Sequence, residues 1–289
     1  MPGARLTFRD GFTLALGGGG ARGWAHIGVA RALQAQGMRP TRIVGTSMGA
    51  IIGAGMAAGH SPEEMEAVAR RTSVYRHMRR GRLALFDAHE LLVRTAAALG
   101  NPRIEELPHP LGVTTYDLVA GRPALITSGP LVEALEKSIA VPFFLPPKRD
   151  AAGVWCDAGP WEGVPVTLAR VWAPDQPVIG VLADIPKPAF LASRMGAATL
   201  RRASARLAPR DGGERLTARR YLSLLTARWA EPVVVEPPDL LIAPRLRWMN
   251  ALQFGNIGRA IAIGERDALA ALATIGAPRP IRSEVTPGA

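Results

Sequence analysis

The stretch TLALGGGGARGWAHIGVARALQ, residues 13–34, joins a short apolar run, four consecutive glycines and a segment with helical composition. The apolar run predicts a strand over residues 12–16, and the segment after the glycines predicts a helix that ends at Gly37. A strand, a glycine turn and a helix N-terminus form an anion site, because the N–H groups of the turn converge and the helix end adds partial positive charge. The stretch therefore predicts an α/β sheet with an anion-binding loop at the end of a strand.

Two kinds of anion fit such a loop. One is a dinucleotide pyrophosphate, because Gly18, Gly20 and Gly23 satisfy the pattern GxGxxG. A dinucleotide site also needs an acidic residue about twenty positions later, and none occurs between positions 10 and 63. A variant that binds NADP through Arg42 is retained as an alternative. The other anion is the oxyanion formed during acyl transfer.

The oxyanion hypothesis requires a nucleophile, and GTSMG, residues 45–49, supplies one. Ser47 stands in a GxSxG pattern between a predicted strand, residues 42–46, and a helix of small residues, which is the setting of a nucleophile elbow. Gly45 and Gly49 are the small flanking residues that permit the strained turn. Two adjacent parallel strands would bring the glycine loop and Ser47 together at their carboxyl ends.

The chain order of the histidines argues against a Ser-His-Asp triad. In α/β-hydrolases the acid and then the histidine follow the serine, whereas all five histidines here lie before residue 110. His26 is expected to pack within the first helix. A lone carboxylate can serve as the base when desolvation makes it more basic and the fold aligns it with the hydroxyl. Asp157, which follows the predicted strand GVWC, is the best placed, although spacing alone does not separate it from Asp117.

Strand and helix signals alternate along the rest of the chain, which indicates the α/β class with helices on the faces of a sheet. An N-cap and Glu64 at its third helical position begin a helix at Ser61. The further expected strands are 112–118, 123–128, 154–157, 177–184 and 239–244, and the further expected helices are 130–139 and 258–276. Residues 186–238, rich in Arg and Ala, are expected to form helical excursions outside the sheet.

The charge, the cysteine content and the apolar stretches of the chain limit which functions are expected. The formal charge of +11 suggests binding to nucleic acid or anionic lipid, but nearly all of the 35 basic residues are arginine, as in a chain with biased codon composition. The denser runs, 76–82 and 201–220, are the candidates for contact with lipid headgroups, and no nucleic acid is expected. A single cysteine, Cys156, excludes an internal disulfide framework. Without an apolar stretch long enough to span a membrane, or a signal peptide, the expected location is cytoplasmic, with peripheral membrane contact as an addition.

The sequence resembles the patatin-like phospholipases, particularly the bacterial members. The resemblance rests on GGGGARGWAHIGVARALQAQG (17–37), on GTSMGA (45–50) and on the segment from 112 to 147. It extends over residues 12–185, and residues 239–246 and 253–269 are similar to the C-terminal strand and helix of the family. The resemblance implies a three-layer α/β/α sandwich with a mostly parallel central sheet. It also implies a Ser-Asp dyad acyl hydrolase that uses neither a metal nor another cofactor.

Carried over residue by residue, the resemblance implies that Ser47 is the nucleophile and Asp157 the base that accepts its proton. The oxyanion hole would be formed by the backbone N–H groups of Gly18, Gly19 and Gly20, beside Arg22. The remaining motif glycines are Gly23, Gly45, Gly49 and Gly159. The implied substrates are phospholipids, lysophospholipids or other fatty-acyl esters.

The dyad segment CDAGPWEGVPV, residues 156–166, departs from the family at two positions. Ala158 replaces a glycine, and Gly163 stands where asparagine is common. If the loop required a positive φ at 158, alanine would cost on the order of 1 kcal/mol. The alternative function is therefore a catalytically degenerate lipid-binding or regulatory protein. In either case residues 1–289 are expected to form one domain, with a core of 12–185 and 239–275 and a lid or excursion at 186–238.

Overall fold

The computed structural model describes residue 8 and the ranges 11–72, 88–141, 145–183 and 237–276. Eight strands of the described chain form one sheet in the order β5–β6–β3–β2–β1–β7–β8, with β4 paired to β3 off this path. The strands are β1 (Thr13–Leu16), β2 (Arg42–Thr46), β3 (Leu111–Asp117), β4 (Arg122–Ile126), β5 (Lys148–Asp150), β6 (Gly153–Cys156), β7 (Val178–Val181) and β8 (Leu240–Ile242).

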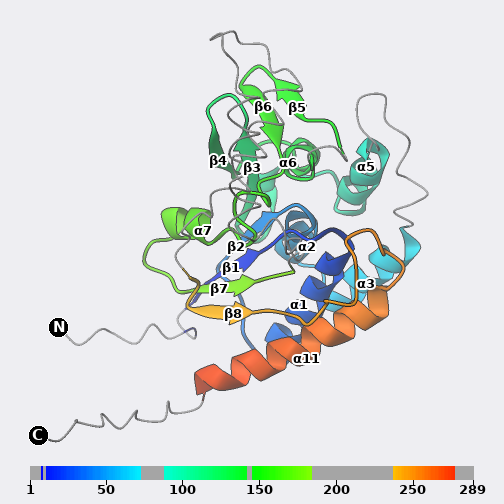
Figure 1. The fold of residues 1–289 in the computed structure, drawn as a ribbon, viewed down its shortest axis with the longest axis vertical. Helices are drawn as coiled ribbons and strands as arrows, with labels where there is room; N and C mark the ends of the chain where they lie inside the picture. The colour runs from blue at the N-terminus through cyan, green and yellow to red at the C-terminus, as the bar shows by residue number, and fades with distance from the viewer. Residues whose placement is uncertain (1–7, 9–10, 73–87, 142–144, 184–236, 277–289) are drawn as a thin grey trace, which may run out of the picture.

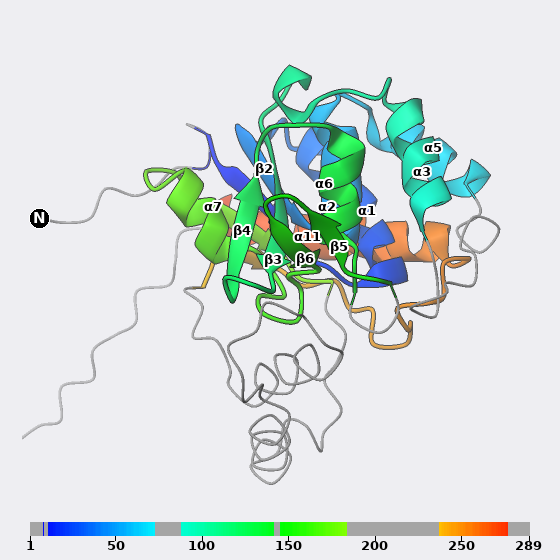
Figure 2. The same ribbon diagram turned by 90° about the horizontal axis from the view of Figure 1, so that it is seen from above.

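Helices cover both faces of this sheet. They are the 3₁₀ helices η2 (Gly20–Trp24) and η3 (Ile104–Glu106) and the α-helices α1 (Ala25–Ala35), α2 (Met48–Ala57), α3 (Pro62–Arg71), α5 (His89–Ala98), α6 (Leu131–Ser138), α7 (Val166–Trp172) and α11 (Ile257–Gly276). Figures 1 and 2 show α1 and α2 on one side of the sheet and α7 on the other.

Period-two alternation along the strands supplies both faces with apolar side chains. Leu14 and Leu16 of β1 belong to the large core cluster on the side of α1 and α2. Ala15, between them, packs in a second cluster with Val166 and Ala169 of α7. Strands β3, β2, β1, β7 and β8 are parallel, whereas β4, β6 and β5 join antiparallel at one end. The protein is a three-layer α/β/α sandwich with a mixed, mostly parallel sheet, which confirms the α/β class predicted from the pattern and the architecture implied by the resemblance.

The C-terminal helix α11 is locked to α1 by close backbone contact. A Cβ on Gly28 of α1 would lie 2.0 Å from the carbonyl O of Ile261, and a Cβ on Gly264 of α11 would lie 2.2 Å from that of Ala25. Because neither position has room for a side chain, the backbones of the two helices are in direct contact there. The last described helix is thereby fixed beside the first, next to the glycine loop (Figure 1).

Several local features differ from the sequence predictions. The predicted first helix begins with the separate 3₁₀ turn η2 before α1 starts at Ala25, and the short elements β5, α5 and α7 were not predicted. By contrast, the capping box predicted at Ser61 is confirmed, with Glu64 at the third helical position. The predicted excursion at 186–238 and both arginine-rich runs lie outside the described residues, apart from 237 and 238. None of the described helices is long and apolar enough to cross a lipid bilayer.

Candidate active site

Two strands meet end to end along one side of β3, and this meeting creates the candidate site. Strand β2 runs parallel to β3 and ends with Thr46 opposite Thr114. Strand β6 runs antiparallel to β3 and ends with Cys156 opposite Tyr116. The residues that follow these strands, Ser47 and Asp157, therefore arrive at the same level of β3 from opposite directions.

Hydrogen bonds within β3 and its neighbours hold this junction. The Thr115 hydroxyl, at the level where the strands meet, donates to the carbonyl O of Cys156 at 2.9 Å. The Thr114 hydroxyl lies 2.5 Å from the Thr46 hydroxyl and donates to the carbonyl O of Gly45 at 3.2 Å. These buried threonines thus tie both strand ends to β3.

Ser47 occupies a strained turn between β2 and α2. Its φ is 55° and its ψ is −123°, a conformation that costs a non-glycine residue about 1–3 kcal/mol. The Ser47 N–H donates to the Ser138 hydroxyl at 2.8 Å. A Cβ on Gly49 would lie 2.3 Å from the carbonyl O of Leu16, so the start of α2 sits directly against β1. The surrounding contacts impose the strained turn, as a nucleophile elbow requires.

Asp157 is buried, with 3% of its surface exposed. Its N–H donates to the carbonyl O of Ala140 at 3.1 Å, and its Oδ1 accepts from the Gly159 N–H at 2.6 Å. Desolvation raises the pKa of the Asp157 carboxyl to about 6, and hydrogen bonds from the Ser47 side chain and the Gly159 N–H act in the opposite direction. The side chain is therefore an unusually basic carboxylate that interacts with the serine hydroxyl.

The structure separates alternatives that spacing left open. Asp117, at the end of β3, turns its Oδ1 to the N–H groups of Val119 and Ala120 in the β3–β4 turn, so it is Asp157 that meets Ser47.

Arg42 lies at the level of Thr13, the opposite end of β1 from the glycine loop, and its guanidinium stacks over Trp172 at 5.6 Å. The alternative in which Arg42 binds a phosphate at that loop is therefore wrong.

The glycine loop lies beside Ser47. A Cβ on Gly18 would be 3.5 Å from the Ser47 Cβ, in ordinary contact. Gly19 and Gly20 have φ of 148° and 56°, and a Cβ on Gly19 would lie 2.1 Å from the carbonyl O of Ala183. Among the described residues, no partner accepts a hydrogen bond from the N–H of Gly18 or Gly19. These donors are available next to the serine, at the start of the η2 turn.

Residues distant in sequence brace this loop. The Ala21 N–H donates to the carbonyl O of Ala251 at 2.8 Å, and the Arg22 Nε donates to that of Met249 at 2.6 Å. The fully buried His26 lies with its Nε2 2.8 Å from the carbonyl O of Gly17. Burial lowers the pKa of His26 to about 4, so at neutral pH the ring is neutral and its Nε2–H donates to Gly17. His26 packs in the core as expected, and it also anchors the loop.

The two departures in the dyad segment have little local cost. Ala158 does not adopt a positive φ; it is buried against the cluster that contains Tyr116 and Cys156. The strain considered for alanine at this position is therefore absent. A Cβ on Gly163 would meet no atom closer than the Leu182 Cδ1 at 3.7 Å, so the structure leaves room for a side chain at this position.

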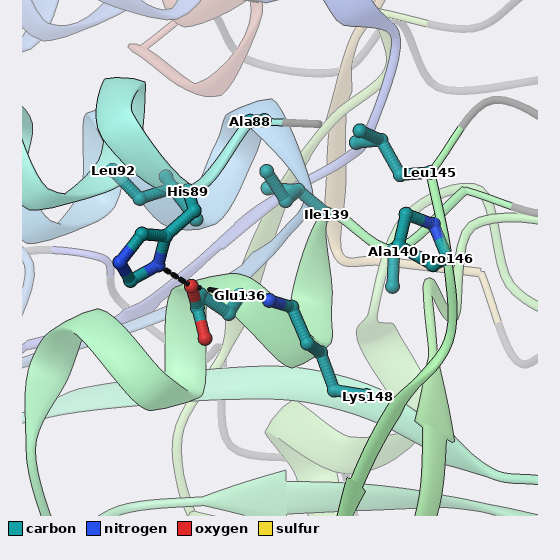
Figure 3. Close-up of a pocket in the computed structure, with 9 residues that line it drawn as sticks. All are labelled: Ala88, His89, Leu92, Glu136, Ile139, Ala140, Leu145, Pro146 and Lys148. Atoms are coloured by element: carbon teal, nitrogen blue, oxygen red, sulfur yellow. Dashed lines mark hydrogen bonds and ion pairs between the residues drawn. The ribbon is translucent and has the colours of Figure 1, made fainter. Parts of the chain in front are cut away.

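A hollow of about 240 Å³, including space open to solvent, lies near the site. Figure 3 shows its lining, formed by Ala88, His89, Leu92, Glu136, Ile139, Ala140, Leu145, Pro146 and Lys148. His89 and Lys148 both contact Glu136 Oε1, Lys148 at 3.1 Å. Ala140, whose carbonyl binds the Asp157 N–H, connects the hollow to the dyad loop. Residues 142–144, which precede Leu145 and Pro146 of this lining, lie outside the described residues.

Several known proteins are similar to this chain. A family model for patatin-like phospholipases matches residues 14–170. An uncharacterized NTE family protein of Mycobacterium tuberculosis is 34% identical over 177 residues, which cover 60% of this chain and 46% of that protein. The lysophospholipase NTE1 of Mycosarcoma maydis is 30% identical over 172 residues, 54% of this chain and 9% of that protein. The crystal structure of VipD from Legionella pneumophila matches with a TM-score of 0.49 at 14% identity, covering 92% of this chain and 67% of VipD.

The fold and the site define an α/β/α protein with a glycine loop and a GxSxG turn at the carboxyl edge of its sheet. Because the family model spans more than half of the chain, the protein belongs to the patatin-like phospholipase family. The chain spans about half the length of the mycobacterial relatives that it matches.

Proposed function

We propose that this protein is a serine acyl hydrolase that cleaves fatty-acyl esters of phospholipids or lysophospholipids through a dyad of Ser47 and Asp157. The observation that carries the proposal is the meeting of a strained serine with a buried carboxylate of raised pKa at one edge of the sheet. A desolvated carboxylate is a stronger base than a solvated one, and a strained elbow presents a hydroxyl to an incoming carbonyl.

The mechanism follows from the dyad. Asp157 accepts the proton of the Ser47 hydroxyl as its oxygen attacks the ester carbonyl. Collapse of the tetrahedral intermediate breaks the bond to the alcohol, which leaves with the proton from Asp157, and an acyl-serine remains. A water molecule then gives its proton to Asp157 and attacks the acyl-serine. The second tetrahedral intermediate breaks its bond to the Ser47 oxygen, which takes the proton back from Asp157, and the fatty acid is released.

The glycine loop is the proposed oxyanion hole. The N–H groups of Gly18, Gly19 and Gly20 are the proposed donors, and the positive φ of Gly19 and Gly20 supports the convergence of such donors. Each donor would lower the barrier by about 3 kcal/mol. Arg22 acts through its hydrogen bond to Met249, which holds the loop in position.

The substrate class is inferred from family membership. Patatin-like phospholipases act on lipid esters in general, and one relative is named a lysophospholipase. The first experiment measures the free fatty acid released from mixed phospholipid and lysophospholipid vesicles by wild type, Ser47→Ala and Asp157→Asn. We expect release by wild type and at least about a thousandfold less by either variant. The lipids that disappear identify the substrate.

Two outcomes would contradict the proposal. Equal release by wild type and Ser47→Ala would exclude this serine as the nucleophile. No release by any protein, together with no labelling of Ser47 by a fluorophosphonate, would favour the degenerate lipid-binding function.

The pH profile tests the base separately. Because the pKa of Asp157 is about 6, log kcat/KM on a soluble ester should rise with unit slope up to about pH 6 and then stay level to pH 9. If log kcat/KM instead fell again above neutral pH, another titrating group would have to act as a required acid.

A further inference from the structure

The segment between β8 and α11 carries an exposed aromatic residue among cations. Trp248 is 37% exposed and Leu252 is 45% exposed. Arg245, Arg247 and Arg259 are also exposed, and the Arg259 guanidinium lies 4.0 Å from the centre of the Trp248 ring. We call these five residues the Trp248 surface. Buried Leu246 and Met249 alternate with the exposed residues and fix the segment to the core.

The local charge of this surface is positive. No acidic residue occurs between positions 240 and 264. The neighbouring acid, Asp267, is largely buried, with one oxygen on the Arg245 N–H and the other 2.7 Å from the Arg266 guanidinium. Its carboxylate is paired with Arg266 and also attracts Arg245. The three arginines of the Trp248 surface remain as a cationic group around an apolar tip.

The same segment touches the glycine loop from behind the exposed face. The carbonyl oxygens of Met249 and Ala251 accept from the Arg22 Nε and the Ala21 N–H at 2.6 and 2.8 Å. The Trp24 Nε1 donates to the carbonyl O of Phe254 at 3.2 Å, and the two rings pack edge to face. Figure 1 shows the segment as the orange connection that leads to α11. A membrane bound at the Trp248 surface would thus be separated from the glycine loop by this one segment of the chain.

We propose that the Trp248 surface docks the protein on an anionic phospholipid bilayer, with Trp248 and Leu252 in the headgroup region and the three arginines on lipid phosphates. An indole ring and an aliphatic tip flanked by arginines match an interface that is apolar on one side and anionic on the other. Docking there would hold the bilayer one chain segment away from the glycine loop, and its value for catalysis rests on the proposed function. The docking itself is independent of catalysis.

The test measures binding to vesicles whose lipids have no acyl ester for an acyl hydrolase to cleave. Wild-type protein is sedimented with vesicles of ether-linked phosphatidylglycerol or of ether-linked phosphatidylcholine at 0.1 M salt. We expect binding to the anionic vesicles and little to the zwitterionic ones. Arg247→Gln/Arg259→Gln should bind about 25-fold more weakly, because each cation at an anionic surface contributes a factor of about five. Trp248→Ser should bind about tenfold more weakly, since part of an indole ring leaves the interface.

Matched variants control for nonspecific effects. Arg39→Gln/Arg149→Gln removes two other exposed arginines, and Val171→Ser removes a side chain that is 74% exposed on α7; both should bind like wild type. Brominated ether lipids should quench tryptophan fluorescence in wild type and less in Trp248→Phe, which shows directly whether Trp248 enters the bilayer. Wild-type affinity in either test variant, or equal quenching in wild type and Trp248→Phe, would overturn the proposal. Because these lipids contain no acyl ester, neither result depends on the proposed acyl hydrolase activity.

Discussion

Replacing Asp157 with asparagine should stabilise the protein at neutral and alkaline pH. Burial raises the pKa of this carboxyl from 3.8 to about 6. An acid whose pKa is higher in the folded state favours folding when protonated, so stability is lost as the pH rises from 3.8 to 6 and stays lost above. At about 1.4 kcal/mol per pH unit, the ionised carboxylate costs about 3 kcal/mol. Asparagine is neutral and its carbonyl can still accept from the Gly159 N–H.

We therefore expect Asp157→Asn to be about 1–3 kcal/mol more stable than wild type at pH 8, with the difference shrinking to near zero at pH 4. Urea unfolding of both proteins from pH 4 to pH 8 measures this difference. The variant comparison is needed because His26, whose pKa falls from 6.5 to about 4, has the opposite effect: its stability is present above pH 6.5 and is lost as the pH falls toward 4. That contribution is common to both proteins and cancels.

Asp117→Asn is the matched control. Asp117 ends the neighbouring strand, and its carboxylate accepts two backbone N–H groups in an open turn. Its replacement should give no gain in stability at any pH. The reasoning about Asp157 would be refuted if Asp157→Asn were less stable than wild type at pH 8, or if its gain were the same at pH 4.

Three further substitutions test individual contacts. Ser47→Gly should be about 1–2 kcal/mol more stable than Ser47→Ala, because glycine relieves the φ of 55° that alanine keeps; equal unfolding free energies would show that the turn is unstrained. His26→Ala should lower the unfolding free energy by about 2–4 kcal/mol and reduce kcat more than KM changes, and His26→Gln, which can still donate toward Gly17, should recover part of both losses. If glutamine behaved like alanine, the histidine would act through its volume alone. Gly163→Ala should be neutral or up to about 1 kcal/mol stabilising in urea unfolding, and a clear loss would mean that the loop needs glycine there.

Local sequence predicted the parts of the site that depend on neighbouring residues. An apolar run followed by glycines and a helix predicts an anion-binding loop, and GTSMG after a strand predicts a nucleophile elbow. Both predictions are possible because the backbone geometry of these turns is specified within a few residues. The strands that flank them and the capping box at Ser61 were predicted for the same reason. The elements β5 and α7 were missed because segments of 3 and 7 residues carry too little periodic signal. Helix α5 was missed because it begins after Ala88 without a side-chain cap, so no start signal marks it.

The tertiary structure decided which distant groups share the site. Sequence spacing admitted both Asp117 and Asp157, and only the antiparallel approach of β6 to the end of β2 brings Asp157 to Ser47. The pairing of Arg22 with Met249 joins residues 227 positions apart, and the raised pKa of Asp157 exists because the folded core removes its water. Sequence by itself determined the chemical groups and their local turns. Their meeting, and the basicity it creates, depend on long-range packing that no local pattern encodes.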